Sequence, residues 1–188
     1  KPYFKFKSNT LFLCFFISFL CYIIFTFDKT LRQIMKLEIV PFHQKYSKDF
    51  YALNVEWLEK FFFVEPYDEK VLSNPKQYIL DTGGFIFFVK NEDEIIGTVA
   101  LINQNTFFEL SKMAISPAYQ GLKIGQQLIE YCINFAKEQQ WKTITLYSNR
   151  KLIPAINLYK KVGFIEAPLE KDVHYERANI KMVLNLSF

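Results

Sequence analysis

From residue 35 onward, the apolar positions of the chain follow two periods, one typical of helices and the other typical of strands. Three segments space their apolar side chains three or four positions apart, which predicts helices with one apolar face. They are residues 47–62 (with Phe50, Leu53, Trp57 and Phe61), 121–137 and 153–162. A further short helical piece is expected from Asp68, and Gly163 is a natural C-terminal residue for the third helix.

Six other segments are short, apolar or alternating, and they are bounded by turn residues, which predicts strands. They are residues 37–40, 85–90, 95–103, 107–116, 143–147 and 177–186. The turn at 91–94 predicts a tight hairpin between the second and third of these strands. The order of elements predicts an α/β fold of the α+β type, in which a mixed sheet is flanked by helices.

The first 34 residues form an apolar and basic segment that differs from the remainder of the chain. Residues 11–27 read LFLCFFISFLCYIIFTF, and 17 residues of helix span about 26 Å, which with the flanks suffices to cross a membrane. A single-pass N-terminal membrane anchor is therefore one interpretation. The other is upstream sequence read through before Met35, since the chain begins with Lys1 and residues 35–188 make a self-sufficient domain.

Composition and charge limit the class of protein. With 51% hydrophobic and 22% charged residues, the chain can bury a core and is not a disordered type. Residues 1–34 carry five basic side chains and one acidic, whereas the remainder carries 18 of each. Because the domain from residue 35 has no concentrated basic surface, nucleic acid is not an expected partner. The three cysteines are too few and too scattered for a disulfide framework.

The segment from Glu109 to Leu128 contains the clearest chemical signal. A predicted strand ends at Ile115, and a short turn with Gly121 and Gly125 leads into a helix. Free N–H groups and the helix dipole at such an N-terminus suit an anion such as a pyrophosphate. The sequence patterns GxxxxGK[ST] and GxGxxG are absent, which disfavours nucleoside triphosphates and dinucleotides.

These residues resemble the GNAT superfamily of acyl-coenzyme A dependent N-acetyltransferases. The family motif Q/R-x-x-G-x-G/A is matched by Gln120 and Gly125 and departs at the middle glycine, which is Lys123 here. The segment 155–164, AINLYKKVGF, is similar to the AxxLYxxxGF helix of the family. The resemblance covers most of residues 35–188 and implies a central, mostly antiparallel sheet flanked by helices.

The resemblance also implies a cofactor site for acetyl-CoA and no metal. In the family, backbone N–H groups of this loop hold the pyrophosphate, and the preceding strand end pairs with the pantetheine arm like an added strand. The cofactor-binding residues implied here are Met113, Ala114, Ile115, Gln120, Gly121, Leu122, Lys123, Ile124, Gly125, Gln126, Asn149 and Tyr159. Asn149 lies three residues before Leu152, the position at which family members often carry Asn.

Two residues are candidates for proton transfer during attack of an amine on a thioester. Tyr159 occupies the family position whose hydroxyl reaches the departing sulfur; the alternative is an aromatic side chain packed on the sheet. Glu109 has the spacing of the catalytic glutamate in the histone-modifying branch; the alternative is a solvated carboxylate or a partner for Lys112 or Arg177. Strand alternation places Glu109, Ser111, Met113 and Ile115 on one face.

The acceptor amine is expected between the first helices and the last strands. Carboxylates and aromatic rings there would suit a cationic amine, although a solvated helix face above a core stripe explains the same residues. These residues are Glu56, Trp57, Glu59, Phe61, Phe62, Phe63, Glu65, Tyr67, Asp68 and Glu69, with residues 174–177 on the other side.

We therefore expect a cytoplasmic N-acetyltransferase domain that acts on a small or peptide amine. Two other classes remain open, namely a non-catalytic acyl-CoA sensing module and a membrane protein whose soluble part is structural. A homodimer is a family expectation only. Cys132, on the apolar face of a predicted helix, is expected to be a buried inert thiol.

Overall fold

The computed structural model describes residues 35–171 and 173–186. Residues 1–34, for which we expected either a membrane anchor or upstream sequence, lie outside the described ranges. Within the described ranges, no helix is both long enough and apolar enough to span a membrane. The described residues from Leu37 onward form one compact unit.

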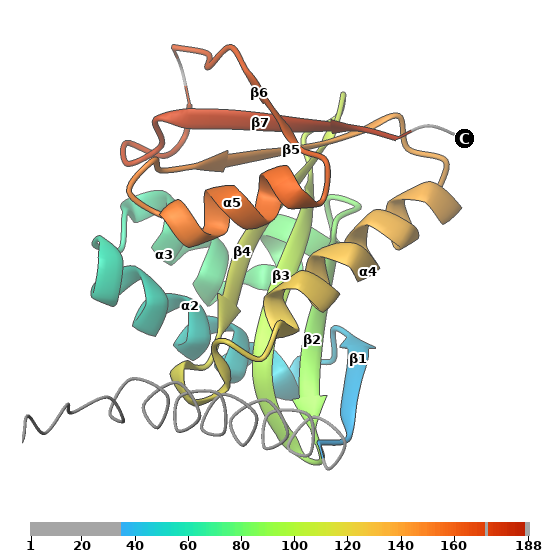
Figure 1. Cartoon of the computed structure of the whole chain (residues 1–188). Coiled ribbons are helices and arrows are strands. Elements are labelled where there is room, and N and C mark those ends of the chain that lie inside the picture. The colour runs from blue at the N-terminus through green and yellow to red at the C-terminus, as the bar shows by residue number, and fades with distance from the viewer. Residues whose placement is uncertain (1–34, 172, 187–188) are drawn as a thin grey trace, which may run out of the picture. The chain divides into compact units, whose positions relative to one another are not determined.

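The unit is built on a seven-stranded sheet in the order β1-β2-β3-β4-β5-β7-β6 (Figure 1). All neighbouring pairs are antiparallel except β4 and β5, which are parallel. The strands are β1 (Leu37–Pro41), β2 (Phe85–Asn91), β3 (Glu94–Asn103), β4 (Phe108–Ile115), β5 (Thr143–Ser148), β6 (Ile165–Ala167) and β7 (Ile180–Asn185). The helices are α2 (Ser47–Phe61), α3 (Pro66–Ser73), α4 (Ile124–Glu138) and α5 (Ile153–Lys161), with a π-helical turn at Lys76–Leu80. The predicted mixed, mostly antiparallel sheet flanked by helices is confirmed.

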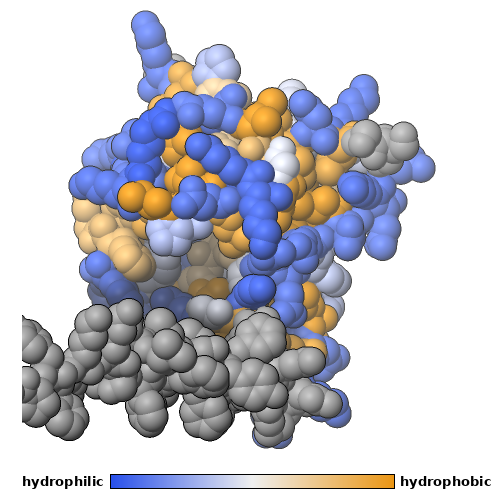
Figure 2. Space-filling model, viewed as in Figure 1, coloured by the Kyte–Doolittle hydropathy of each residue, from blue (hydrophilic) through white to orange (hydrophobic). Residues whose placement is uncertain are grey.

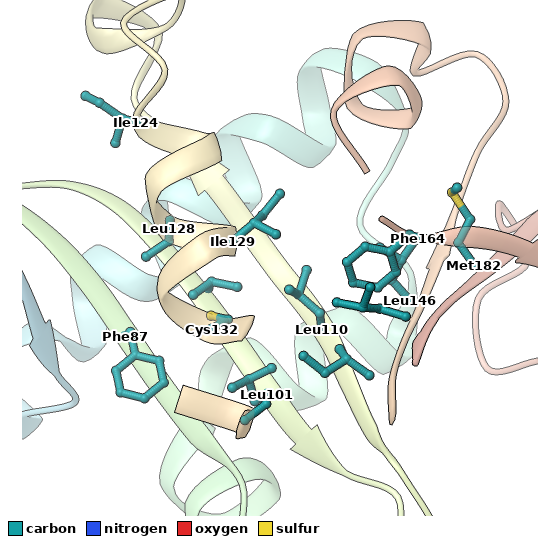
Figure 3. Close-up of a cluster of buried hydrophobic side chains, with 14 of the residues drawn as sticks. Phe87, Leu101, Leu110, Ile124, Leu128, Ile129, Cys132, Leu146, Phe164 and Met182 are labelled. Atoms are coloured by element: carbon teal, nitrogen blue, oxygen red, sulfur yellow. The ribbon is translucent and has the colours of Figure 1, made fainter. Parts of the chain in front are cut away.

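Alternating side chains of the central strands build a separate core on each face of the sheet. Phe87 and Leu101 face α4 and α5 in one core, whereas Phe88 and Ile102 face α2 and α3 in the other. Figure 3 shows the first core, where the α4 side chains lie over the strands. The helices therefore cover both faces of the sheet, α4 and α5 on one face and α2 and α3 on the other (Figure 1).

Two predicted helix details were wrong. Helix α4 begins at Ile124 rather than at residue 121, because Gly121 and Lys123 adopt the left-handed conformation and form a turn. In α2, Phe61 is 45% exposed, and the buried side chains are Phe50, Asn54 and Leu58 at four-residue spacing.

The C-terminal region also differs from the prediction. Strand β7 begins at Ile180 rather than at residue 177, and residues 177–179 belong to the preceding loop. The short strand β6 was not predicted because three residues give too short a pattern. It follows Gly163, whose φ of 102° turns the chain out of α5 and back toward β7.

The geometry of β4 is the feature that positions the site. Strand β4 pairs with β5 only through Phe108 and Glu109, so the two strands diverge beyond that point. On its other side, β4 carries a bulge: Lys112 has φ 50°, and the register with β3 shifts between Ala100 and Thr98. The strand therefore presents an unpaired edge where it runs toward α4.

Candidate active site

The loop between β4 and α4 has the backbone conformation of an anion site. Gly121 has φ 81°, and a Cβ atom built there would meet nothing within 4 Å, so the backbone faces open space. Lys123 has φ 61°, a conformation in which glycine is favoured and in which the family motif has glycine. Lys123 therefore adopts the left-handed conformation in place of the glycine of the motif, at a cost in backbone strain.

The N-terminus of α4 leaves its first amides without helical partners. The first hydrogen bond of the helix runs from the N–H of Gln127 to the carbonyl of Lys123, 3.1 Å away, and no side chain caps the end. The N–H groups of Ile124, Gly125 and Gln126 thus lie at the positive end of the helix dipole. This arrangement suits the phosphate oxygens of a ligand.

An open groove of about 310 Å³ lies beside this N-terminus. The predicted cofactor residues that line it are Ile115, Gln120, Gly121, Lys123, Ile124, Gly125 and Gln126, together with Tyr119 and Leu158. Leu122 and Ala114 do not line it. A Cβ atom at Gly125 would lie 3.0 Å from Cε of Met113, so α4 packs closely on β4 at this position.

The strand end is partly engaged by the protein itself. The side-chain amide of Gln120 donates a hydrogen bond to the carbonyl of Ile115 at 3.0 Å. A ligand that pairs with this carbonyl would have to replace the Gln120 amide.

A second, more enclosed cleft of about 90 Å³ continues along the diverging strands. Its lining residues are Asn54, Trp57, Leu58, Phe62, Asp68, Leu110, Ser111, Lys112, Met113, Tyr147, Ser148, Asn149, Leu152, Tyr159, Tyr175, Arg177 and Ala178. Figure 2 shows the surface hollowed between α5 and α2, where these elements meet. The volume holds a few water molecules or the reacting groups of two small substrates.

Tyr159 lies on α5, lines this cleft and packs at 6.0 Å from the ring of Phe164. Burial raises the pKa of its hydroxyl to about 12. Tyr159 is thus held in the protonated, donating form at neutral pH.

Asn149 is also on the cleft, but both ends of its amide are engaged. Its Nδ2 donates to the carbonyl of Arg177 at 2.6 Å, and its Oδ1 accepts from the N–H of Lys151 at 2.9 Å. The side chain joins the start of α5 to the loop before β7.

Glu109 lies immediately behind the cleft, 2% exposed, and does not line it. Its carboxylate accepts hydrogen bonds from Gln104 at 2.9 Å and from the hydroxyl of Tyr175 at 3.1 Å. The hydroxyls of Tyr175 and Ser111 are 3.2 Å apart, and both residues line the cleft. A solvated carboxylate is therefore the wrong interpretation of Glu109.

The predicted grouping of residues along β4 was wrong in part. Glu109 and Ser111 share the face of Tyr175, whereas Met113 and Ile115 contact Gly125 on the face of α4. The bulge at Lys112 interrupts the alternation, which a residue-by-residue count along the strand cannot anticipate.

A buried ion cluster forms one wall of the cleft. The carboxylate of Asp68 receives Nζ of Lys112 at 2.6 Å and the guanidinium of Arg177 at 2.6 Å. Glu65 bonds Arg177 at 2.9 Å and also accepts the backbone N–H groups of Glu176 and Arg177. Two acids and two bases thus neutralise each other and hold the loop before β7 against α3.

The pKa values in this cluster reflect opposing effects. Burial alone would raise the pKa of Asp68, but hydrogen bonds and charge from Arg177 and Lys112 outweigh it and lower the pKa. Burial would lower the pKa of Arg177, and its bonds to Asp68 raise it. Both residues are therefore charged at neutral pH.

The predicted acceptor residues separate into three groups. Trp57 and Phe62 line the cleft, with ring centroids 5.8 Å apart, and so do Asp68, Tyr175 and Arg177. Glu65 is buried in the ion cluster. The others do not line the cleft: Glu56, Glu59, Phe61, Phe63, Tyr67, Glu69, His174 and Glu176.

Sequence analysis missed Asn54 and Tyr147 as cleft residues. The only signal for Asn54 was its position four residues from both Phe50 and Leu58, on the buried face of α2. Nothing local distinguishes Tyr147, because its place depends on the divergence of β5 from β4.

Two other features bear on the chemistry of the described residues, namely the Cys132 thiol and the arrangement of possible metal ligands. Cys132 lies on the buried face of α4, where burial raises the pKa of its thiol well above the usual range (Figure 3). Among residues 35–171 and 173–186, no group of three or more His, Cys, Asp or Glu side chains is arranged to hold a metal ion.

Comparisons with known proteins agree with this geometry. The model of the acetyltransferase (GNAT) family matches residues 32–164. An uncharacterised N-acetyltransferase of Dictyostelium discoideum is 35% identical over 79 residues, which cover 39% of this chain and 37% of that protein. The chain therefore matches well under half the length of that relative.

Solved structures share the fold over nearly their whole length. An acetyltransferase of the GNAT family from Staphylococcus aureus has a TM-score of 0.72 and 25% identity, covering 80% of this chain and 99% of that one. The PaiA N-acetyltransferase of Thermoplasma acidophilum, solved with coenzyme A, has a TM-score of 0.64 and 17% identity, covering 81% of this chain and 100% of that one.

Proposed function

Because this chain belongs to the acetyltransferase (GNAT) family, we propose that it transfers an acetyl group from acetyl-CoA to a primary amine by direct attack. The observation that supports this proposal most directly is that the groove and the cleft follow one another along the same edge of β4. The groove at the α4 N-terminus and the cleft at Tyr159 both border the free part of β4, and Ile115 and Met113 line one each.

The groove would hold the pyrophosphate on the amides of Ile124, Gly125 and Gln126. The ammonium of Lys123 adds positive charge at the same place. The pantetheine arm would follow the free edge of β4 as an added strand, and the thioester would then lie near Met113 and Tyr159. Asn149 would stabilise the loop that borders this path.

Each proton transfer has a candidate residue. Tyr159 keeps its proton at neutral pH and would donate it to the departing thiolate. Glu109 would receive the proton that the ammonium of the acceptor must lose before attack. Acetyl-CoA supplies the activated acyl group when bound, so the chain needs no nucleophile of its own.

The acceptor would approach from the end of the cleft lined by Trp57, Phe62 and Asn54. The aromatic rings suit the apolar body of an amine, and Glu109 leaves the surroundings of the neutral ion cluster with a net negative charge, which favours a cation. We therefore propose a cationic amine with an apolar or aromatic body.

The test is release of the coenzyme A thiol by the full chain with acetyl-CoA and phenethylamine, putrescine or a lysine-containing peptide. The proposal expects amine-dependent release that is much slower in Tyr159→Phe and unchanged in Tyr131→Phe, a tyrosine on the far side of α4 against Phe87. Binding of acetyl-CoA without release for any amine would favour the alternative, a non-catalytic sensing module.

A further inference from the structure

Glu109 is separated from the cleft by two hydroxyl groups that touch each other. The carboxylate is 2% exposed, and the Tyr175 hydroxyl contacts both Glu109 Oε1, at 3.1 Å, and Ser111 Oγ, at 3.2 Å. Ser111 and Tyr175 both line the cleft, whereas Glu109 does not. An amine in the cleft therefore meets these two hydroxyls rather than the Glu109 carboxylate itself.

The direction of the hydrogen bonds follows from the number of hydrogens. Ionised Glu109 can only accept, so the single phenolic hydrogen of Tyr175 is donated to the carboxylate. In the contact with Ser111, the Tyr175 oxygen must then be the acceptor and the Ser111 hydroxyl the donor. The oxygen of Ser111 is thereby left as an acceptor on the cleft side, where an ammonium N–H can donate to it.

Charged and titratable side chains surround the hydroxyl of Tyr175 and the carboxylate of Glu109. Lys112 lies 4.7 Å above the Tyr175 ring, and the Arg177 guanidinium lies 5.0 Å from it. Asp68 and Glu65 neutralise these two cations, while Tyr67 packs at 5.4 Å from Tyr175 and stacks on His174. On β5, burial and then the charges of Glu170 and Glu109 raise the pKa of Tyr147, whose hydroxyl donates a hydrogen bond to Glu170 at 3.3 Å.

Burial, followed by the charge of Glu109, raises the pKa of Tyr175 well above its usual value. The phenol is therefore neutral throughout the working range, as a group that passes a proton on must be.

We propose that Ser111 and Tyr175 form a proton relay that connects the acceptor amine to Glu109. This inference rests on the proposed acetyl transfer. An ammonium N–H bond breaks as a bond to Ser111 Oγ forms, the hydrogen of Ser111 moves to the Tyr175 oxygen, and that of Tyr175 moves to Glu109. The products are a neutral amine, a neutral carboxylic acid and two unchanged hydroxyl groups, so no other reactant is needed.

The kinetic test compares Ser111→Ala, Tyr175→Phe and the double variant with phenethylamine as acceptor. Each single variant is expected to lower kcat/KM about a hundredfold at pH 7, the range of a lost acid–base step. The deficit shrinks as pH rises toward the ordinary amine pKa of about 10.4, because the free amine then needs no base. The kcat/KM of the double variant should be no lower than that of the slower single variant, because removing either hydroxyl already interrupts the relay.

Tyr67→Phe is the matched control, because it removes a phenol next to Tyr175 that is not in the relay. It should leave the rate and its pH dependence unchanged. A second readout is independent of turnover: the ¹³C chemical shift of the Glu109 side-chain carboxyl at pH 7, assigned with Glu109→Gln. It should change in Tyr175→Phe, which removes a hydrogen-bond donor to the carboxylate, and not in Tyr67→Phe.

The outcomes separate the relay from the activity itself. No amine-dependent transfer by the unmodified chain contradicts the proposed function, and the relay with it. Transfer by the unmodified chain together with a normal rate in Ser111→Ala, or deficits that multiply in the double variant, overturns the relay alone.

Discussion

The buried ion cluster should contribute far more to stability than an exposed pair of equal length. The pairs Lys112–Asp68 and Lys76–Asp81 both have an N···O distance of 2.6 Å, but their side chains are 3% and 0% exposed in the first pair and 66% and 53% in the second. Removing one partner of a buried pair leaves an uncompensated charge, which costs about 3–5 kcal/mol. An exposed pair is worth about 0–1 kcal/mol.

The perturbation is therefore Asp68→Asn, with Asp81→Asn as its matched control. A chain of this length loses about 2–4 °C in Tm for each kcal/mol. Asp68→Asn should thus lower Tm by about 6–20 °C and Asp81→Asn by less than about 4 °C, as measured by circular dichroism at pH 7. Equal changes in the two variants would refute the reasoning that burial decides the value of these pairs.

The same variant has a defined pH dependence. Since the pKa of Asp68 in the folded state lies below its ordinary value of 3.8, its stabilisation is present above about pH 4. It is lost as pH falls through the folded-state pKa. The difference in Tm between the unmodified chain and Asp68→Asn should therefore narrow below pH 4.

Three further predictions concern the loop between β4 and α4 and the cleft at Tyr159. Tyr159→Phe should lower kcat about a hundredfold with little change in the Kd for acetyl-CoA, measured by calorimetry; an unchanged kcat would remove the residue from acid catalysis. Lys123→Gly should raise Tm by up to about 6 °C without ligand. Relief of a left-handed residue, about 1–2 kcal/mol, exceeds the entropic cost of glycine, about 0.5–1 kcal/mol, by up to about 1.5 kcal/mol. A lower Tm would show that Lys123 is not strained. Burial raises the pKa of Tyr147 and Tyr159 to about 12 in the folded state, so above about pH 10 these tyrosines lose their protons in the unfolded chain first, and the Tm of the unmodified chain should fall as pH rises. The Tm of Tyr159→Phe should fall less steeply with pH, because one of these tyrosines is gone. Equal slopes in the two proteins would contradict the raised pKa of Tyr159.

Local patterns were sufficient for most of the fold. Helical spacing located α2, α4 and α5 to within a few residues, and alternation located six of the seven strands. Strand β6 escaped prediction because a three-residue strand is defined by its pairing with β7 rather than by its own sequence.

The candidate site was predictable where a motif fixes the backbone and not where distant elements meet. Gly121 and Gly125 were identified from the glycine-containing turn that leads from a strand into a helix, and Gly125 also from the motif. The side of β4 on which Met113 lies depends on the bulge at Lys112, and the contact of Tyr175 with Glu109 joins residues 66 positions apart. Neither feature has a local signal in the sequence.

The central claim is that the N-terminus of α4 and the free edge of β4 hold acetyl-CoA. The most direct measurement is the Tm of the full chain with acetyl-CoA, with adenosine diphosphate and without ligand. A ligand at a hundred times its Kd stabilises the folded state by about 2.7 kcal/mol, so acetyl-CoA should raise Tm by about 5–11 °C and adenosine diphosphate by less. No change in Tm at millimolar acetyl-CoA would contradict the account.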